Sequence, residues 1–278
     1  MRMSSAYTSL LTFLVFPWVL ALAQPAQPTA NILSRVLMIQ SPYFRGTTFS
    51  VDVDSREYWI TAKHILTGAK HPPYGVVTDQ SGLLSILDPG AQGEVWLPVK
   101  FSVIDPGKDI DIVILAAPEP LMKNPLPSEP ADSVGVMLGG DCEFLGFPYG
   151  GGWRASFDNG QSSWMPFVKH CNVSALSPPT EPRIWVLDGI NNDGFSGGPV
   201  IFRTGAEQKI LAVISGYVQE PAEVISSAVP QKTVANGEKK LTVPLNSGFI
   251  LAYDISYAIN AIHKNPIGPA RLPPTNPQ

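Results

Sequence analysis

Residues 191–200 read Asn-Asn-Asp-Gly-Phe-Ser-Gly-Gly-Pro-Val and place one serine, Ser196, among three glycines and a proline. The apolar runs on either side, residues 184–187 and 200–202, lack helical spacing and are predicted to be strands. The serine is therefore expected on a tight loop between strands. Because glycines let backbone N–H groups turn inward, the N–H groups of Gly194 and Ser196 are candidates to hold an oxyanion. A Gly-Pro turn that happens to contain a serine has the same composition, so other residues must distinguish the two.

The composition is that of a globular protein. The 278-residue chain has a net charge of -4, with 15% charged and 44% hydrophobic residues. This length is enough for one large domain or two small ones. The mild acidity and the lack of Lys/Arg runs predict no nucleic-acid partner.

The first residues have the pattern of a secretory signal peptide, expected to span residues 1–23. Arg2 supplies a positive charge, residues 10–22 are apolar, and Ala-Leu-Ala at 21–23 is a small-x-small cleavage signal. An uncleaved membrane anchor is the alternative, but the apolar run is shorter than the ~20 residues that span a bilayer. We therefore expect export to the periplasm or the medium, no stable membrane insertion after cleavage, and a loose mature N-terminus at residues 24–32.

The chain contains two cysteines, Cys142 and Cys171. In an oxidising compartment they are predicted to form one disulfide, and two separate buried thiols are the alternative. Two cysteines cannot make a structural zinc site by themselves, and no pair of histidines has ligand spacing. No metal and no cofactor are therefore expected.

Many short strand patterns, turn signals and almost no helix predict an all-β barrel or sandwich. A proline-rich segment at residues 118–133 is predicted to be a stiff linker between two strand sets, residues 33–117 and 134–262, which suggests two barrels. Residues 255–262 have helical spacing and are predicted to close the fold as a short helix. Residues 263–278 are Pro-rich and are expected to be a disordered tail.

A serine nucleophile needs a base within hydrogen-bond reach, and the base needs an orienting carboxylate. Of the histidines, His64 is the one that directly follows a predicted strand, residues 57–62. Asp111 stands at the entrance of the apolar run 112–117, where a carboxylate can be buried beside an imidazole. Asp109 is also close enough in sequence to be the orienting group, so both aspartates stay candidates.

Three segments together resemble the signature blocks of the chymotrypsin-fold serine proteases, in order and in spacing. They are Tyr-Trp-Ile-Thr-Ala-Lys-His at 58–64, Asp-Ile-Val-Ile-Leu at 111–115 and Gly-Phe-Ser-Gly-Gly-Pro at 194–199. Residues 145–150 and 246–262 are similar to segments of the bacterial trypsin-like group that includes the Deg-type proteases. The resemblance covers about residues 33–262 and does not extend to a PDZ domain.

The resemblance implies two six-stranded antiparallel β-barrels with a short C-terminal helix, and a serine endopeptidase that hydrolyses polypeptides through an acyl-enzyme intermediate. In these roles Ser196 attacks the carbonyl, His64 takes and returns the proton, and Asp111 fixes the tautomer of His64. The backbone N–H groups of Gly194 and Ser196 would form the oxyanion hole.

The resemblance also implies a substrate cleft lined by Ser215, Gly216 and Tyr217, which would pair with an extended peptide. Ile190, six residues before Ser196, would fall near the base of the specificity pocket. Since Ile190 carries no charge, an apolar or small substrate side chain is expected there.

Two residues depart from the family pattern. Phe195 stands where zymogen-type members have an aspartate, so activity is expected not to depend on a salt bridge with a newly cut N-terminus. Lys63 replaces the small residue often found before the histidine, and it is expected to point to solvent.

Two other functions stay open. One is a secreted barrel of the same fold that binds peptides without cutting them. The other is an esterase, because Ser196 also fits the Gly-x-Ser-x-Gly elbow of α/β-hydrolases. That elbow needs a helix directly after the serine, and Gly-Gly-Pro at 197–199 starts a helix poorly.

Overall fold

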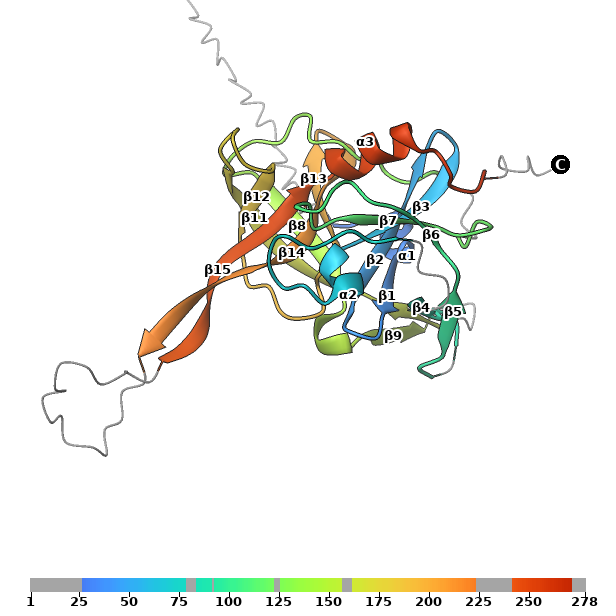
Figure 1. Ribbon diagram of the computed structural model, residues 1–278, viewed down its shortest axis with the longest axis horizontal. Coiled ribbons are helices and arrows are strands. Elements are labelled where there is room, and N and C mark those ends of the chain that lie inside the picture. Colours follow the sequence, from blue (N-terminus) through green and yellow to red (C-terminus); the bar gives the residue numbers. More distant parts are fainter. Residues whose placement is uncertain are drawn as a thin grey trace, which may run out of the picture.

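The computed structural model describes residues 27–78, 84–91, 93–122, 126–156, 162–223 and 242–271 (Figure 1). The predicted signal peptide, residues 24–26 and residues 272–278 lie outside this part of the chain. Strands dominate, as the sequence predicts. Among the described residues, no helix is long and apolar enough to span a bilayer.

The first half of the molecule is one antiparallel sheet of seven strands, in the order β5-β4-β1-β2-β3-β7-β6. Its strands are β1 (Val36–Gln40), β2 (Arg45–Val53), β3 (Arg56–Thr61), β4 (Leu84–Leu87), β5 (Trp96–Val99), β6 (Ser102–Ile104) and β7 (Val113–Ala116). This sheet corresponds to the first predicted barrel and curls as a half-barrel, because β5 and β6 stand at the two ends of its order although only residues 100 and 101 separate them in the chain. Strands β5 and β6 follow each other directly and together take the place of one predicted strand, and β5 pairs with β4 at one end of the order. An edge position tolerates Pro98, which cannot donate to a neighbouring strand.

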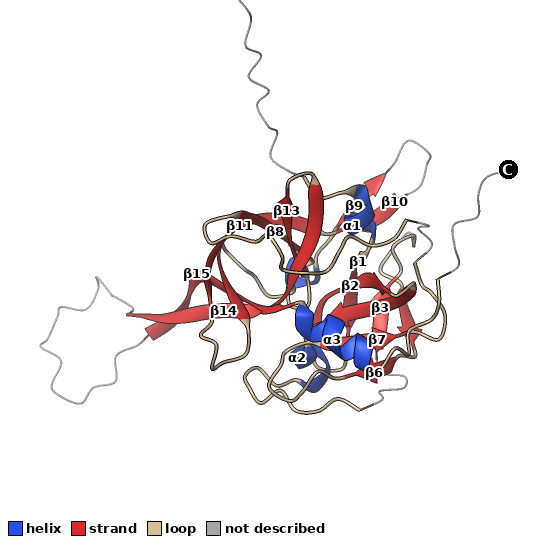
Figure 2. Cartoon of the chain, turned by 90° about the horizontal axis from the view of Figure 1, so that it is seen from above, coloured by secondary structure: helices blue, strands red, loops and turns tan. Residues whose placement is uncertain are grey.

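The second half is a closed antiparallel barrel of six strands, in the order β11-β12-β15-β14-β13-β8, which confirms the predicted second barrel. Its strands are β8 (Asp141–Gly146), β11 (Phe167–Leu176), β12 (Ile184–Asp188), β13 (Pro199–Thr204), β14 (Glu207–Glu223) and β15 (Thr242–Asp254). A small two-stranded sheet, β9 (Trp153–Ser156) with β10 (Ser162–Met165), is separate from it. Figure 2 shows the closed barrel on the left and the seven-stranded sheet on the right.

The two cysteines lie opposite each other on neighbouring strands of the barrel. Cys142 in β8 and Cys171 in β11 are register partners, and a disulfide joins them with a Cα–Cα distance of 5.0 Å. The bond closes a loop with a sequence separation of 29, for which chain entropy predicts a contribution of ~3 kcal/mol. The predicted disulfide is therefore present in the structure.

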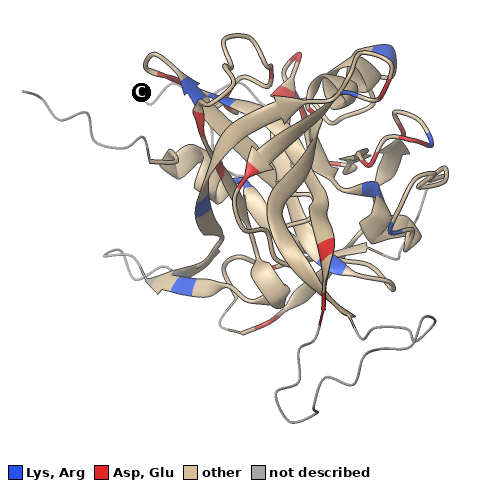
Figure 3. Cartoon of the chain, turned by 90° about the vertical axis from the view of Figure 1, so that its left-hand side faces the viewer, with Lys and Arg blue, Asp and Glu red and all other residues tan. Residues whose placement is uncertain are grey.

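Strands β14 and β15 are 17 and 13 residues long and run on past the barrel as a two-stranded arm, residues 218–223 and 242–247 (Figure 1). The segment that joins the two strands at the far end lies outside the described residues. Basic and acidic residues are interspersed rather than segregated by sign on the side of the molecule that carries the arm (Figure 3).

Helices are short, as expected. They are α1 (Ala30–Ser34), α2 (Lys63–Thr67) and α3 (Ser256–Lys264), with one 3-10 turn at Pro148–Gly150. The apolar residues of α3 that point inward, Ala258 and Ile262, are buried. This helix is the predicted C-terminal helix, and it contacts β7 of the first sheet.

Both ends of the described chain are more ordered than the sequence suggests. In the expected loose N-terminus, the Thr29 hydroxyl caps α1 and Ile32 is buried. In the expected disordered tail, Arg271 forms an ion pair of 2.9 Å with Asp52, and the carbonyl of Pro269 accepts from the N–H of Glu57. Every residue, proline included, has a backbone carbonyl that can accept a hydrogen bond from a neighbouring hairpin. A Pro-rich composition therefore does not show that this segment packs against the fold.

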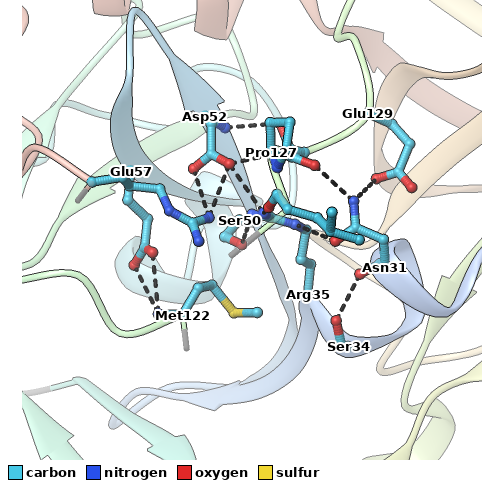
Figure 4. Close-up of polar contacts among 12 residues, drawn as sticks. Asn31, Ser34, Arg35, Ser50, Asp52, Glu57, Met122, Pro127 and Glu129 are labelled. Atoms are coloured by element: carbon cyan, nitrogen blue, oxygen red, sulfur yellow. Dashed lines mark hydrogen bonds and ion pairs between the residues drawn. The ribbon is translucent and has the colours of Figure 1, made fainter. Parts of the chain in front are cut away.

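The linker between the two halves is fastened to the first sheet by buried polar groups (Figure 4). Arg35 is almost fully buried, pairs with Asp52 at 3.0 Å and donates to the carbonyl of Leu126 at 2.6 Å. Asp52 in turn accepts from the N–H of Ser128 at 2.8 Å. The carboxylate of Glu57 accepts from the N–H groups of two further linker residues. The linker is therefore packed against the first sheet, and near its end the carbonyl of Pro130 accepts from the N–H of Ile210 in β14 at 2.8 Å.

Candidate active site

His64 lies at the point where the first sheet gives way to helix α2. Strand β3 ends at Thr61, and Lys63 opens the helix, which stops at Gly68 because this residue has a φ of 76°. The ring of His64 packs edge-on against Phe44, with centroids 6.1 Å apart. Its side chain is 16% exposed, so the imidazole is both held in place and reachable from solvent.

Asp111 is fully buried and is bonded to His64 by both of its carboxylate oxygens. Oδ1 accepts from the backbone N–H of His64 at 2.8 Å, and Oδ2 lies 2.7 Å from the ring Nδ1. Oδ2 also accepts from the hydroxyl of Ser215 at 2.5 Å. A carboxylate on Nδ1 favours the tautomer that leaves Nε2 unprotonated.

The other aspartate candidate does not take this place. Asp109 is exposed, and its backbone carbonyl accepts from the hydroxyl of Tyr253 at 3.3 Å. The structure therefore distinguishes the two aspartates that the sequence left open.

Two tyrosines lie close to Asp111, and both remain uncharged. Tyr253 and Tyr74 contact each other edge-on, with ring centroids 6.3 Å apart. Burial, together with the negative charge of Asp111, raises the pKa of the Tyr74 phenol, and burial also raises that of Tyr253 well above its ordinary value. The surroundings of Asp111 thus contain no second anion from these phenols.

Ser196 lies on the loop before β13, where the sequence places it, and its hydroxyl donates to the carbonyl of Ser215 at 3.3 Å. His64 and Ser196 line the same groove, which has a volume of about 640 Å³. Gly194, Ser215 and other residues of the second half line it as well. The structure therefore brings His64 and Ser196 to one groove built from both halves, and Asp111 is buried behind the ring of His64.

The backbone of this loop comes so close to its surroundings that side chains are excluded. Gly194 has a φ of 102°, and a Cβ on it would meet the carbonyl of Phe147. A Cβ on Gly197, whose φ is 83°, would meet the carbonyl of Thr47. Glycine is required here for both conformation and space.

Thr47 in β2 fastens the loop to the first sheet. Its N–H donates to the carbonyl of Ser196 at 2.8 Å, and its hydroxyl donates to the carbonyl of Gly194 at 2.7 Å. In the described part of the chain, the N–H groups of Gly194 and Ser196 make no hydrogen bond. Both donors are thus available beside the serine, as an oxyanion site requires.

Phe195 is buried and packs edge-on against Phe144, with ring centroids 4.9 Å apart. The position that would hold an acid in zymogen-type proteases is therefore part of the apolar core of the barrel.

The expected substrate residues are only partly where the sequence suggests. Ser215, Gly216 and Tyr217 line the groove, as predicted. Ile190 does not line it: its side chain is 51% exposed, and its carbonyl accepts from the amine of Lys169. Asn191 is 2% exposed and lines the groove instead. The distance in sequence from Ser196 does not identify Asn191 as the groove residue. Strand β12 ends at Asp188, and the turn that follows determines which side chain lines the groove.

Lys63 is also not where the sequence suggests. It is fully buried, and its amine lies 2.5 Å from the Asp105 carboxylate and 2.5 Å from the carbonyl of Gly107. Asp105 further accepts from the N–H groups of Val77 and Gly107, each at 2.8 Å. The ion pair thus joins the helix that carries His64 to the turn that precedes Asp111.

Replacing Lys63 by methionine is expected to lower the free energy of unfolding by about 3 kcal/mol, because Asp105 loses the partner of its buried charge. Denaturant unfolding followed by tryptophan fluorescence measures this. The matched control is the same change at Lys108, whose side chain is exposed and which should shift stability by less than about 0.5 kcal/mol. Equal effects of the two variants would show that the buried pair contributes little.

Among the described residues, no group of three or more His, Cys, Asp or Glu side chains could hold a metal ion.

No protein-family model matches the chain, and no curated protein matches it. Several solved structures, in contrast, are similar to the chain. The active form of the Rv3671c protease from M. tuberculosis is similar at 17% identity and a TM-score of 0.49, over 92% of this chain and 97% of that one. The HtrA-type protease AlgW with a tripeptide is similar at 15% identity and a TM-score of 0.49, over 84% of this chain and 60% of that one. Deg5 is similar at 19% identity and a TM-score of 0.43, over 66% and 80%. The solved structures named here thus include a protease and an HtrA-type protease.

Proposed function

We propose that this protein is an exported serine endopeptidase in which Ser196, His64 and Asp111 form the catalytic triad. The observation that carries the proposal is the buried carboxylate of Asp111, bonded to both the backbone and the ring of His64 at the edge of a groove that also holds Ser196. A buried carboxylate on the far nitrogen of a reachable imidazole is the arrangement that a serine nucleophile needs.

The reaction follows from these positions. The Ser196 hydroxyl attacks the carbonyl carbon of the scissile bond, Nε2 of His64 takes the proton, and the carbonyl electrons move to oxygen. The N–H groups of Gly194 and Ser196 then hold the oxyanion. The intermediate collapses, the C–N bond breaks, and the departing amine takes the proton from His64. Water repeats the same steps on the acyl-enzyme and releases the acid.

The carboxylate of Asp111 stabilises the imidazolium that forms on His64. Ser215 connects the parts of the site, because its hydroxyl donates to Asp111 while its carbonyl accepts from Ser196. The nucleophile of the second half is thereby coupled to the acid of the first half through one residue of β14.

A polypeptide is the proposed substrate because one edge of β14 is available next to Ser196. Strand β13 pairs with β14 as far as Val213, whereas β15 continues along the opposite edge as far as Glu223. Ile214 is still paired with the serine loop, through Gly197 and Gly198. The free edge therefore begins after Ile214 and includes the groove residues Ser215 and Tyr217. An extended peptide can add to this edge as a further strand and present its carbonyl to the serine.

Export through a cleavable signal peptide is part of the proposal. The disulfide between Cys142 and Cys171 supports it, because such bonds persist in oxidising compartments outside the cytosol.

The test is covalent labelling with a fluorescent organophosphonate, which reacts with an activated serine. Wild-type protein should be labelled with a 1:1 stoichiometry, and Ser196→Ala should not be labelled at all. The same change at Ser174, an exposed serine of β11, is the matched control and should leave labelling intact. A correctly folded wild-type protein that takes no label would instead favour a barrel that binds peptides without cutting them.

A further inference from the structure

Asn191 is buried at the groove with one polar atom unused. Its side chain is 2% exposed, and it lines the groove that also holds Ser196 and Gly194. Its side-chain oxygen Oδ1 is buried and has no hydrogen-bond partner among the described residues. Buried polar atoms are nearly always paired, so an unpaired one at a candidate active site calls for a ligand-based explanation.

The backbone of Asn191 is fixed without the help of this oxygen. The carbonyl of Asn191 accepts from the side-chain amide of Asn246 at 2.6 Å. Asn246 also accepts from the N–H of Gly248 at 3.0 Å, and the carbonyl of Gly248 accepts from the N–H of Gly189 at 2.9 Å. Strand β15 therefore holds the turn, and the side-chain oxygen takes no part in holding it.

The charges around Asn191 favour an uncharged donor over a cation. The acidic residue among the groove residues is Asp193, which is exposed and lies on the serine loop. The amine of Lys169 contacts both sequence neighbours of Asn191: it bonds the carbonyl of Ile190 and lies 3.2 Å from Oδ1 of Asn192. A substrate cation would have no buried carboxylate to pair with and would meet this positive charge, which is costly in a desolvated site.

We propose that Asn191 selects the substrate residue that supplies the scissile carbonyl, and that it favours side chains with an uncharged hydrogen-bond donor: Asn, Gln, Ser or Thr. This inference rests on the proposed peptidase function, and it replaces the apolar preference that Ile190 had suggested. A donor that reaches Oδ1 removes the penalty of the unpaired atom. An apolar side chain of the same shape leaves the atom unpaired and also displaces any water from it.

Matched pairs of peptide substrates test the preference in the unmodified enzyme. The two peptides of a pair differ only in the residue before the scissile bond, which is Asn or Leu in one pair and Thr or Val in the other. We expect kcat/KM to be about 10-fold higher for the donor of each pair, because an unpaired buried acceptor discriminates by about this factor. A Lys peptide should be cleaved less well than its Gln counterpart. Equal or better cleavage of Leu and Val would overturn the inference.

Variants assign the preference to one side chain. In Asn191→Leu and Asn191→Ala, the ratio of kcat/KM for the Asn and Leu peptides should fall to about one or below. In Ile190→Ala, the ratio should stay as in the wild type, since Ile190 is exposed and does not line the groove. An unchanged ratio in both Asn191 variants, or a lost ratio in Ile190→Ala, would overturn the assignment.

Organophosphonate labelling separates the two possible failures. If Ser196 is labelled and the peptides are cleaved without the donor preference, the peptidase stands and the role of Asn191 is wrong. If folded wild-type protein is neither labelled nor active on any peptide of the set, the proposed function is wrong and the inference is overturned with it.

Discussion

His64→Ala is expected to lower kcat for a cleaved peptide by about five to six orders of magnitude, the loss typical for a serine enzyme without its base. The imidazole is the group that takes the proton of Ser196 and returns it to the leaving amine. In the structure, the ring of His64 is held by Asp111 at 2.7 Å and supported by Phe44. Alanine leaves these neighbours in place but removes both transfers of the proton. Steady-state kinetics with a peptide substrate measures the loss, and the rate of phosphonate labelling should fall in parallel.

The matched control is His170→Ala. His170 lies on β11, is largely exposed and pairs with Asp141 at 3.2 Å on the outside of the barrel. Its replacement should change kcat by less than about 2-fold, since an exposed ion pair contributes little. If His64→Ala kept more than a tenth of the wild-type kcat, the imidazole would not be the base, and the proposed triad would have to be abandoned.

The residues of the proposed triad could be picked out from the sequence because each follows from a local pattern. His64 follows a strand, Asp111 precedes one, and Ser196 lies on a loop whose glycines are required by close backbone contacts at Gly194 and Gly197. The choice between Asp111 and Asp109 needed the structure, because it depends on which side of the chain is buried.

The contacts of Lys63 and Asn191 were not predictable, for different physical reasons. The ion pair of Lys63 joins residues that are 42 positions apart, and no local pattern marks Asp105 as its partner. The inward position of Asn191 depends on a turn whose conformation is set by Asn246 on another strand. In both cases, a neighbour distant in sequence decides where the side chain points.

The extent of the fold was also underestimated at its ends and in the linker. Proline-rich composition lowers the content of regular structure, but it leaves carbonyl groups that other parts of the molecule can use. Arg35 and Glu57 supply charged partners for the backbone of the linker, and Arg56 donates to the carbonyl of Gly268. No pattern in the sequence indicates that these charged side chains bond to backbone groups of the linker and the C-terminal segment.

Asp111→Asn is expected to lower kcat by about 10⁴-fold while leaving KM within a few-fold of the wild type. Three donors converge on this carboxylate: the N–H of His64, the ring Nδ1 of His64 and the hydroxyl of Ser215. A side-chain amide has one acceptor oxygen and one NH₂ group in place of two acceptor oxygens, so at least one of these bonds must be replaced by a poor contact. An NH₂ group that faces Nδ1 favours the tautomer with the proton on Nε2, which cannot accept the proton of Ser196.

Asp109→Asn is the matched control, since it makes the same change two residues away at an exposed side chain, and it should leave kcat within about 2-fold. The pair of variants also separates chemistry from folding. Asp111→Asn keeps the size of a fully buried side chain, so its near-UV circular dichroism should match that of the wild type even though turnover is lost. A 10⁴-fold loss in Asp109→Asn with little loss in Asp111→Asn would move the orienting role to Asp109. Small losses in both would mean that His64 does not depend on a carboxylate, and the bonds that Asp111 makes to it would then serve only to hold helix α2 against the first sheet.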